Sequence, residues 1–359
     1  MELIYGNEER AIDFLKKITE KDRVAIFSHT DVDGFVAGRV MNETIPAEVI
    51  QFLDYSPQLI ANLIPIIKEK KIQKVIFTDL NLEQNKADVK KLAEIAEILI
   101  IDHHEYSEDL NSERVIFIKT PSTTCASYTT YVLLTKTHNT HLEKLDWLVG
   151  SAVIADYTFE SHQEFIKKIE EKYHFANQAK TNSQAFQSDL GKIAIIINNA
   201  TIYFDDKTSE FYSLFKKINA MKDISFVDEY ANTVQKEIDR VVDNFVKFHE
   251  AKNDLFYYQA AVNYGITSAI STILSGRYPK NTIIFLADYG QKMIKISARR
   301  QDGKVNLPQL LGTCMDGLKE TTFGGHFKAA GGSFLKKDLE KFKKRLFALA
   351  LVSTQIDTS

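Results

Sequence analysis

The sequence predicts an α/β fold: a mostly parallel five-stranded sheet with helices on both faces, then a helical linker and a smaller C-terminal α/β domain. Over residues 1–155, short apolar runs rich in β-branched residues alternate with amphipathic stretches, the pattern of strands joined by crossover helices. A second alternating segment follows a long helical one. The chain has 359 residues, which is enough for two domains of roughly 100–200 residues each.

The N-terminal sheet is predicted from five strand-length apolar runs with three amphipathic stretches between them. The last two runs are joined by a stretch too short for a helix, so we expect the fifth strand at an edge of the sheet. In chain order the strands are expected at 24–27, 49–52, 75–77, 98–101 and 115–118, and the helices near 35–43, 57–69 and 84–95.

The second half begins with helical spacing of apolar residues, from about residue 142 to 246. Alternation of strands and helices then returns and is followed by glycine-rich loops and a terminal helix. The strands are expected at 255–262, 282–287 and 293–298, and the helices near 266–275 and from about 336.

The composition excludes several classes of protein. Lys and Arg number 45 and Asp and Glu 48, a net charge of −3, so the chain is not a histone-like packer of nucleic acid. Its two cysteines, Cys125 and Cys314, make no disulfide framework and are typical of a reducing compartment. No signal peptide is visible, and no apolar run reaches the roughly 18–20 residues that span a bilayer. We therefore expect a soluble, cytoplasmic protein with no membrane partner.

Charge is distributed unevenly along the chain. Residues 285–345 hold thirteen Lys and Arg against six Asp and Glu, so the rest of the chain is net acidic. The polar face of the terminal helix explains about half of this basic excess. The remainder favours an anion-binding segment near the C-terminus and a cation-binding body before it.

Carboxylates and histidines follow three of the predicted strands directly, and a fourth acidic residue lies in an apolar helical stretch. Because ligands gather at the carboxyl ends of strands in an open parallel sheet, we expect these side chains to meet at one edge. Taken singly, an Asp after a strand is often only a helix N-cap. Their joint occurrence in order favours a site. The candidate ligands are His29, Asp31, Asp33, Asp79, His103 and Asp156.

The types of these side chains indicate a metal centre. Four carboxylates packed together repel one another unless cations compensate their charge. Four carboxylates and two imidazoles exceed what one structural zinc ion needs, and no thiolate is among them. The mixed oxygen and nitrogen set suits Mn²⁺, Mg²⁺ or Fe²⁺, and the number of ligands suits two ions that share a bridging carboxylate. Two such ions about 3.5–4 Å apart can clamp the reacting oxygens of a phosphoryl group.

At these residues the sequence resembles the DHH phosphoesterase superfamily, through the segment His29 to Gly34, Asp79, the triplet Asp102-His103-His104, and Asp156. The resemblance implies that His29, Asp31 and Asp79 hold one metal ion, usually manganese. It implies that Asp33, Asp79, His103 and Asp156 hold the other. His104 would contact the scissile phosphate or assist the leaving oxygen, and Asp102 would orient the neighbouring histidines.

Near the C-terminus, Gly324-Gly325-His326 resembles the signature of the DHH-associated C-terminal domain, a substrate-binding module. Phe323 stands where the commoner form of that signature has a glycine. Glycines before a histidine let backbone N–H groups approach an anion closely. Upstream, Arg299 matches the arginine that the family offers to substrate phosphate, with Arg300 as a further candidate for substrate binding.

The resemblance implies a catalytic domain over 1–185, a helical linker over 186–250 and a substrate-binding domain over 251–359. It favours an enzyme, a phosphoric diester hydrolase of the nanoRNase type. Such an enzyme degrades short oligoribonucleotides to 5′-nucleoside monophosphates by a hydroxide that two metal ions activate. The predicted partners are short single-stranded RNA or DNA oligonucleotides or small nucleotides, with a homodimer as a further expectation.

Several alternatives remain open at this point. One is a phosphatase or phosphodiesterase for 3′-phosphoadenosine 5′-phosphate (pAp) or for linear or cyclic dinucleotides. Another is a RecJ-like exonuclease on single-stranded DNA. The last is a catalytically silent nucleotide-binding module, which is disfavoured because every expected ligand position holds a competent residue.

Overall fold

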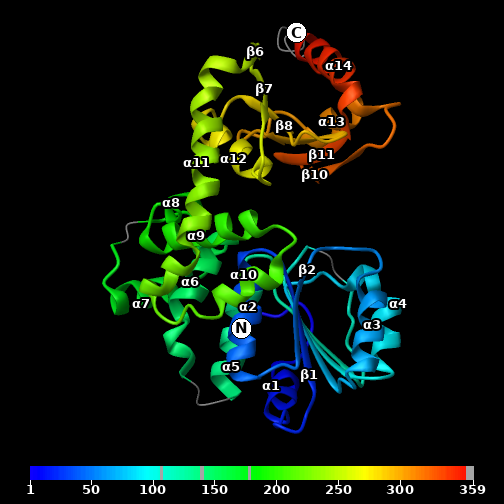
Figure 1. Ribbon diagram of the computed structural model, residues 1–359, viewed down its shortest axis with the longest axis vertical. Helices are drawn as coiled ribbons and strands as arrows, with labels where there is room; N and C mark the ends of the chain where they lie inside the picture. Colours follow the sequence, from blue (N-terminus) through cyan, green and yellow to red (C-terminus); the bar gives the residue numbers. More distant parts are fainter. Residues whose placement is uncertain (106–107, 138–140, 177–178, 353–359) are drawn as a thin grey trace. The chain divides into compact units, whose positions relative to one another are not determined.

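The computed structural model describes residues 1–105, 108–137, 141–176 and 179–352, and the chain divides into two compact units, Met1–Ala231 and Asn232–Ser359 (Figure 1). Each unit has its own sheet and its own hydrophobic core. The last residues of the domain expected over 251–359, from 353 onward, lie outside the described residues.

The sheet of the N-terminal unit has five strands in the order β2-β1-β3-β4-β5, and all of its neighbours are parallel. The five predicted strands are confirmed, and β5 lies at an edge as expected. This order makes β1, β3 and β4 direct neighbours, so their carboxyl ends are adjacent. The strands are β1 Val24–His29, β2 Val49–Leu53, β3 Lys74–Thr78, β4 Glu97–Asp102 and β5 Val115–Lys119.

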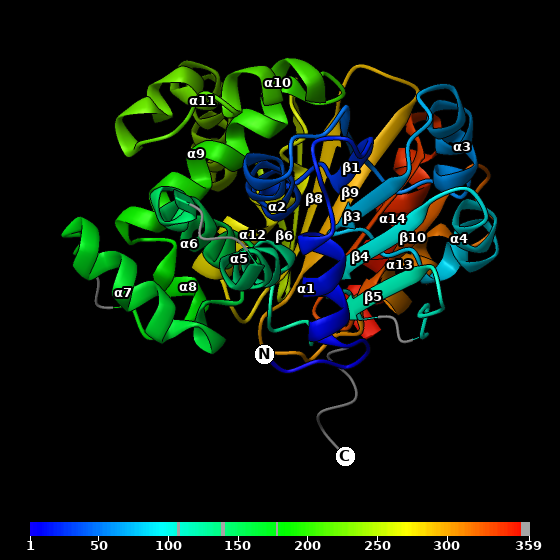
Figure 2. The ribbon, with the colours of Figure 1, turned by 90° about the horizontal axis from the view of Figure 1, so that it is seen from below.

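Helices cover both faces of this sheet because successive side chains of a buried strand point to opposite sides. Ile26 and Ile76 pack in the core under α1, α2 and α5, whereas Phe27 and Phe77 pack in the core under α3 and α4. Figure 2 shows the two helical layers on either side of the strands. The bounds are α1 Glu8–Lys16, α2 Val32–Thr44, α3 Leu59–Glu69, α4 Lys86–Ala93 and α5 Ala126–Thr137.

The helical stretch expected between residues 142 and 246 is confirmed. It contains α6 Asp146–Ala155, α7 Gln163–Tyr173, α8 Asn182–Ala185, α9 Asp189–Phe204, α10 Thr208–Phe215 and α11 Ser225–Phe248. No helix in the described ranges is both long enough and apolar enough to cross a membrane. Single 3-10 turns are η1 Glu83–Asn85, η2 His141–Lys144, η3 Phe159–Ser161, η4 Met221–Ile224 and η5 Lys336–Asp338.

Much of the segment expected as a linker, residues 186–250, packs on the N-terminal unit. Leu190 and Phe204 of α9 and Phe211 of α10 are buried in the main core of that unit. The division between the two units falls inside α11. The functional boundaries after residues 185 and 250 stay predictions.

The sheet of the C-terminal unit is mixed, with the strand order β10-β11-β9-β8-β7-β6 and one parallel pair, β7 with β8. Helix α12 packs on β8 and β9, and α13 and α14 share a core with the other face. The bounds are β6 Glu250–Lys252, β7 Leu255–Ala261, α12 Thr267–Arg277, β8 Thr282–Asp288, β9 Met293–Arg299, α13 Leu307–Met315, β10 Thr322–His326, β11 Ala329–Leu335 and α14 Leu339–Val352.

One expectation for this unit was wrong. The glycine-rich residues 322–335 form a β-hairpin, β10 and β11, and not loops. Glycine weakens a strand in isolation, but β11 pairs with β9 along its whole length, from Ala329 opposite Arg299 to Leu335 opposite Met293. Pairing between distant segments thus overrides the low strand preference of the local sequence.

Candidate functional site

The six predicted ligands come together at the carboxyl edge of the N-terminal sheet. His29 ends β1, Asp79 follows β3, and His103 follows β4. Because these strands are neighbours, their end residues are within reach of one another. Asp156, the residue that ends α6, joins them from the helical layer.

The six side chains, together with His104, form three overlapping groups among the described residues. In each group the ligand atoms lie within 4.8 Å of one another. The Nδ1 atom of His29 lies 3.0 Å from Asp31 and 3.7 Å from Asp79. The Nε2 atom of His103 lies 3.3 Å from Asp79, 3.6 Å from Asp156 and 3.9 Å from Asp33. The groups are His29 with Asp31 and Asp79, Asp33 with His103 and Asp156, and Asp79 with His103 and His104.

Backbone contacts hold the first carboxylates in place. Asp31 caps α2 and accepts a 2.9 Å hydrogen bond from the N–H of Gly34. A side chain at Gly34 would meet the carbonyl oxygen of His29 at 2.3 Å, so the tight turn between β1 and α2 requires a glycine here. Asp33 accepts from the N–H groups of Ala126 and Ser127, at 2.7 and 2.9 Å, where α5 begins.

Asp79, which belongs to two of the groups, has an unusual backbone. Its φ is +59°, in the left-handed region that Asp and Asn tolerate better than other side chains do. Its N–H donates to the carbonyl of Ile101 at 2.9 Å. This conformation places the carboxylate of Asp79, which is 1% exposed, between the histidines of β1 and β4.

The donor set fits two divalent cations. In the described structure, Oδ2 of Asp79, Oδ2 of Asp156 and Nδ1 of His103 are buried and have no hydrogen-bond partner. Burial and the charges of Asp31 and Asp33 raise the pKa of Asp79 well above its ordinary value. Burial and Asp33 raise the pKa of Asp156 to about 9. Cations bound among these carboxylates would remove the repulsion and give the unpartnered oxygens of Asp79 and Asp156 a partner.

We expect the stability of the metal-free protein to fall as pH rises. Burial lowers the pKa of His29, but the nearby carboxylates of Asp31 and Asp79 outweigh it and raise the pKa from 6.5 to about 11. Asp156, with its pKa raised from 3.8 to about 9, also holds its proton more tightly in the folded state. Both contributions to stability are therefore lost with rising pH, from pH 3.8 to 9 for Asp156 and from 6.5 to 11 for His29.

Thermal unfolding in a chelator, followed by circular dichroism, tests this expectation. The midpoint should fall by on the order of 5 °C between pH 7 and pH 9. Saturating Mn²⁺ should reverse the trend, because metal ligands must lose their protons to bind. A chelated protein whose midpoint rises over that range would contradict the assignment of these protonation states.

A buried ion network lies behind the histidines. The ammonium of Lys119 is 2.6 Å from Asp102 and 3.0 Å from Glu83, and the three side chains are fully buried. Asp102 in turn lies 2.7 Å from Nδ1 of His104. Burial raises the pKa of Asp102, but the contacts with His104 and Lys119 outweigh it and hold this pKa below its usual range. The network includes the contact between Asp102 and His104, and the role of Asp102 in orienting the histidines stays a prediction.

Sequence reasoning missed Lys119, Glu83 and Tyr55. Lys119 ends a strand whose preceding residues are apolar, and a lysine there indicates a buried partner. Tyr55 follows the end of β2, and its hydroxyl lies 2.9 Å from Nε2 of His104. Its ring lies 4.8 Å from the ring of His29. The rule that site residues follow strand ends could have found Tyr55.

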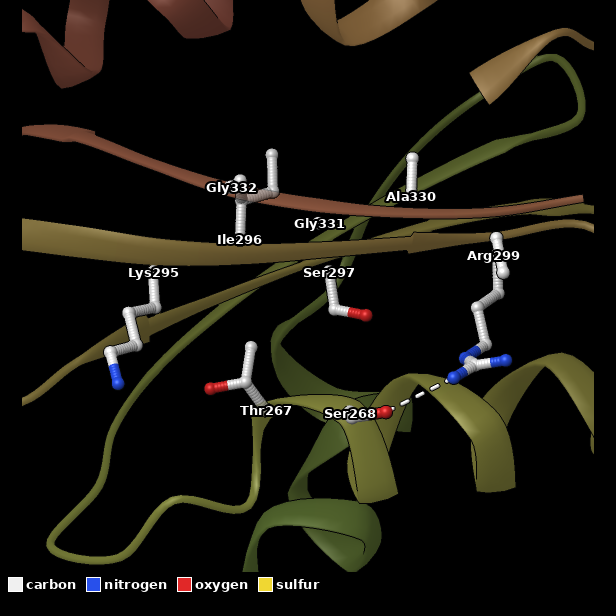
Figure 3. A pocket seen from close by; sticks show the side chains of 10 residues that line it. Thr267, Ser268, Lys295, Ile296, Ser297, Arg299, Ala330, Gly331 and Gly332 are labelled. Atoms are coloured by element: carbon white, nitrogen blue, oxygen red, sulfur yellow. Dashed lines mark hydrogen bonds between the residues drawn. The ribbon is translucent and has the colours of Figure 1, made fainter. Parts of the chain in front are cut away.

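The C-terminal unit carries a pocket of about 350 Å³ on the face of its sheet that α12 covers. Figure 3 shows Lys295, Ser297 and Arg299 of β9 pointing to the same side, toward Thr267 and Ser268 of α12. Alternate residues of a strand point to the same side of the sheet. Once Arg299 is chosen as a candidate, this rule identifies Lys295 and Ser297 from the sequence as further candidates. The remaining lining residues are Ile296 and residues 329–332.

Serine hydroxyls of α12 hold the guanidinium of Arg299. Its Nη2 donates to Oγ of Ser268 at 3.0 Å and its Nε donates to Oγ of Ser271 at 3.3 Å. Oγ of Ser271 also lies 2.7 Å from Oγ of Ser297. A cation held by hydroxyl groups in a pocket with a second cation, Lys295, can bind a phosphate.

The glycines and histidine of the signature lie on β10. The register places His326 opposite Ala329 and Ala329 opposite Arg299, so His326 and Arg299 share a sheet face two strands apart. His326 does not line the pocket. Gly325 has a φ of +132°, and a side chain there would meet the carbonyl oxygen of Ala329 at 2.4 Å. Gly324 has nothing within 4 Å of where its side chain would be.

Arg300 does not line this pocket either. Its side chain is 3% exposed, forms an ion pair with Asp254, and lies 2.7 Å from Asp302. It also donates to the hydroxyl of Thr282 at 3.0 Å. We therefore assign Arg300 to the packing of the C-terminal unit and keep the expectation of phosphate binding for Arg299, while the substrate-binding roles of Gly324, Gly325 and His326 stay predictions.

Two known domain families match the chain: the DHH family, N-terminal domain, over residues 23–157, and the DHHA1 domain, over residues 252–350. A search of curated proteins finds no match. Many solved structures share the fold.

One is RecJ from Thermus thermophilus in complex with Mn²⁺, with a TM-score of 0.67, 15% identity and 98% of this chain covered. The chain spans about half, 55%, of that protein. Another is an exonuclease RecJ bound to manganese, with a TM-score of 0.66, 15% identity and coverage of 98% of this chain and 96% of the other. A third is the pGpG-specific phosphodiesterase PggH from Vibrio cholerae, with a TM-score of 0.52, 13% identity and coverage of 92% and 99%.

Proposed function

The chain contains a DHH N-terminal domain and a DHHA1 domain, and from this premise we propose that it is a metal-dependent phosphodiesterase. Its proposed substrates are short oligoribonucleotides, which it cleaves to 5′-nucleoside monophosphates. One observation carries the proposal: six ligand side chains meet in overlapping groups around Asp79, and several of their buried donor atoms have no partner in the described structure.

The residues would divide between two cations, Mn²⁺ first, with Mg²⁺ or Fe²⁺ as alternatives. His29, Asp31 and Asp79 would hold one ion, and Asp33, Asp79, His103 and Asp156 the other, with Asp79 shared. The chemistry that such ions supply is activation of a water and neutralisation of charge on the phosphoryl oxygens.

His104 is proposed to act on the substrate. Burial lowers its pKa, but the contact with Asp102 outweighs this and raises the pKa above the ordinary value. Nδ1 of His104 is occupied by Asp102, which leaves Nε2, beside the hydroxyl of Tyr55, to face the substrate. From there it can donate a proton to a phosphoryl or leaving oxygen.

Arg299 is proposed to bind a phosphate of the oligonucleotide, with Lys295 and Ser297 beside it in the pocket. Arg299→Ala should lower kcat/KM for oligonucleotides about 10- to 100-fold, because a charge-assisted hydrogen bond is lost. The matched control is Lys337→Ala, an exposed cation of the same unit outside the pocket. Steady-state kinetics at fixed ionic strength would measure both. An equal loss of kcat/KM in the two variants would mean that the effect comes from the net charge of the unit and not from a contact between Arg299 and the substrate.

The substrate is tested directly by incubating the protein and Mn²⁺ with labelled RNA and DNA of two, five and twenty nucleotides, with pAp, and with cyclic dinucleotides. The proposal expects a marked preference for RNA of about two to five nucleotides and no turnover in a chelator. Turnover of pAp or cyclic dinucleotides alone would overturn the substrate assignment. Full activity without metal would overturn the mechanism.

A further inference from the structure

A second cavity of about 490 Å³ opens beside His104 in the N-terminal unit. Two loops at the carboxyl edge of the sheet form it: the loop that joins β2 to α3, and the connection from β3 to α4. Nδ2 of Asn85 donates to the carbonyl of Pro57 at 3.2 Å and so ties the two loops together. The lining residues are Tyr55, Ser56, Pro57, Leu59, Asn81, Leu82, Gln84, Asn85 and His104.

The cavity adjoins the metal-ligand groups. Tyr55 and His104 line it, and Nδ1 of His104 lies 4.0 Å from Oδ1 of Asp79. The ring of Tyr55 also lies 4.8 Å from the ring of His29. A molecule that places a phosphate among the ligands could therefore extend into this cavity.

The residues that line the cavity indicate which kind of molecule it can bind. Among the described residues that line it, His104 is the only charged or titratable side chain apart from Tyr55, so this lining is not built for a phosphate. Leu59 and Leu82, 6% and 2% exposed, give it an apolar side. Three carboxamides, Asn81, Gln84 and Asn85, give it polar groups that both donate and accept hydrogen bonds.

Two side chains have groups available for a ligand. Oδ1 of Asn81 is buried and has no hydrogen-bond partner among the described residues, which is costly unless a ligand supplies one. Tyr55 is 46% exposed, and its ring offers a surface on which a base can stack.

We propose that this cavity binds the nucleobase of the nucleotide whose phosphate lies at the metal centre. A flat ring with polar edges matches apolar residues, an aromatic wall and carboxamides in one cavity. The inference rests on the proposed function, since it places that nucleotide's phosphate among the metal ligands.

The test is equilibrium binding, because it does not require turnover. Isothermal titration of the full chain with Mn²⁺ compares AMP with ribose 5-phosphate, which lacks only the base. The wild type should bind AMP more tightly by on the order of tenfold. In Gln84→Ala and in the double variant Asn81→Ala/Gln84→Ala this preference should shrink to below about threefold. Gln187→Ala, an exposed amide of the same unit outside the cavity, should keep the wild-type preference.

Two results would overturn the inference: no preference for AMP in the wild type, or the same preference in all variants. The second result would place the base elsewhere. Gln84 is exposed, so its single variant remains informative if the double variant fails to fold. Failure of the proposed function would appear separately, as absence of oligonucleotide hydrolysis in a protein whose preference for AMP still depends on Gln84.

Discussion

Asp79→Asn is expected to abolish metal-dependent hydrolysis, with a loss of at least ~10³-fold in kcat, and to stabilise the metal-free protein at the same time. Asp79 is the side chain shared by the two proposed ion sites. Its amide counterpart cannot supply the negative charge that holds two cations together. Binding of Mn²⁺ should accordingly fall from two ions to one or none.

The gain in stability follows from the burial of the same carboxylate. Burial and the charges of Asp31 and Asp33 raise the pKa of Asp79, so ionisation costs folded-state stability whenever no metal is bound. Asn is neutral and has the same shape. It also tolerates the left-handed backbone at φ +59° and keeps the N–H bond to Ile101.

Thermal unfolding with and without Mn²⁺, together with a metal-binding titration, would measure both effects. The midpoint of the variant in a chelator should exceed that of the wild type, and Mn²⁺ should raise it little. The same change at Asp13, which is exposed on α1 and belongs to none of the ligand groups, should keep hydrolysis within about threefold of wild type. Residual metal-dependent activity near wild type in Asp79→Asn would exclude the shared-ligand assignment.

Lys119→Met should destabilise the N-terminal unit by about 3–5 kcal/mol. Removing the ammonium leaves Asp102 and Glu83 buried together without a cation, and both are fully buried. Met fills a similar volume, so the loss reports the uncompensated charge and not a cavity. Hydrolysis should also fall, because Asp102 would no longer be held for its contact with His104.

Urea unfolding at pH 7 measures this loss. Lys86→Met is the matched control: Lys86 pairs with Glu108, but the two side chains are 37% and 43% exposed, so the expected change is about 0–1 kcal/mol. The double variant Lys119→Met/Glu83→Gln should recover part of the stability, since one of the two carboxylates is then neutral. Equal losses of unfolding free energy in Lys119→Met and Lys86→Met would show that the buried network stabilises the protein no more than an exposed ion pair does.

Most of the N-terminal fold and of the ligand set could be predicted from local patterns. Each strand is a short apolar run, and each ligand follows a strand end, so the parallel arrangement alone brings His29, Asp79 and His103 to one edge. The hairpin at 322–335 could not be predicted this way, because its glycines have little preference for a strand and only pairing with β9 defines it. The burial of Arg300 could not be predicted from local patterns either, because its partner Asp254 is remote in the chain.

The sequence by itself determined which side chains are offered for chemistry and at which end of the sheet, because residue type and strand period are local properties. Only the tertiary structure decided how those side chains are supported. The contact of Asp33 with the start of α5, the ion pair of Lys119 with Asp102, and the cavity closed by Asn85 and Pro57 all join segments that are separate in the chain. No periodicity encodes such contacts. They exist because strand order and loop packing bring these groups together, and burial then makes each unpaired charge or polar atom costly.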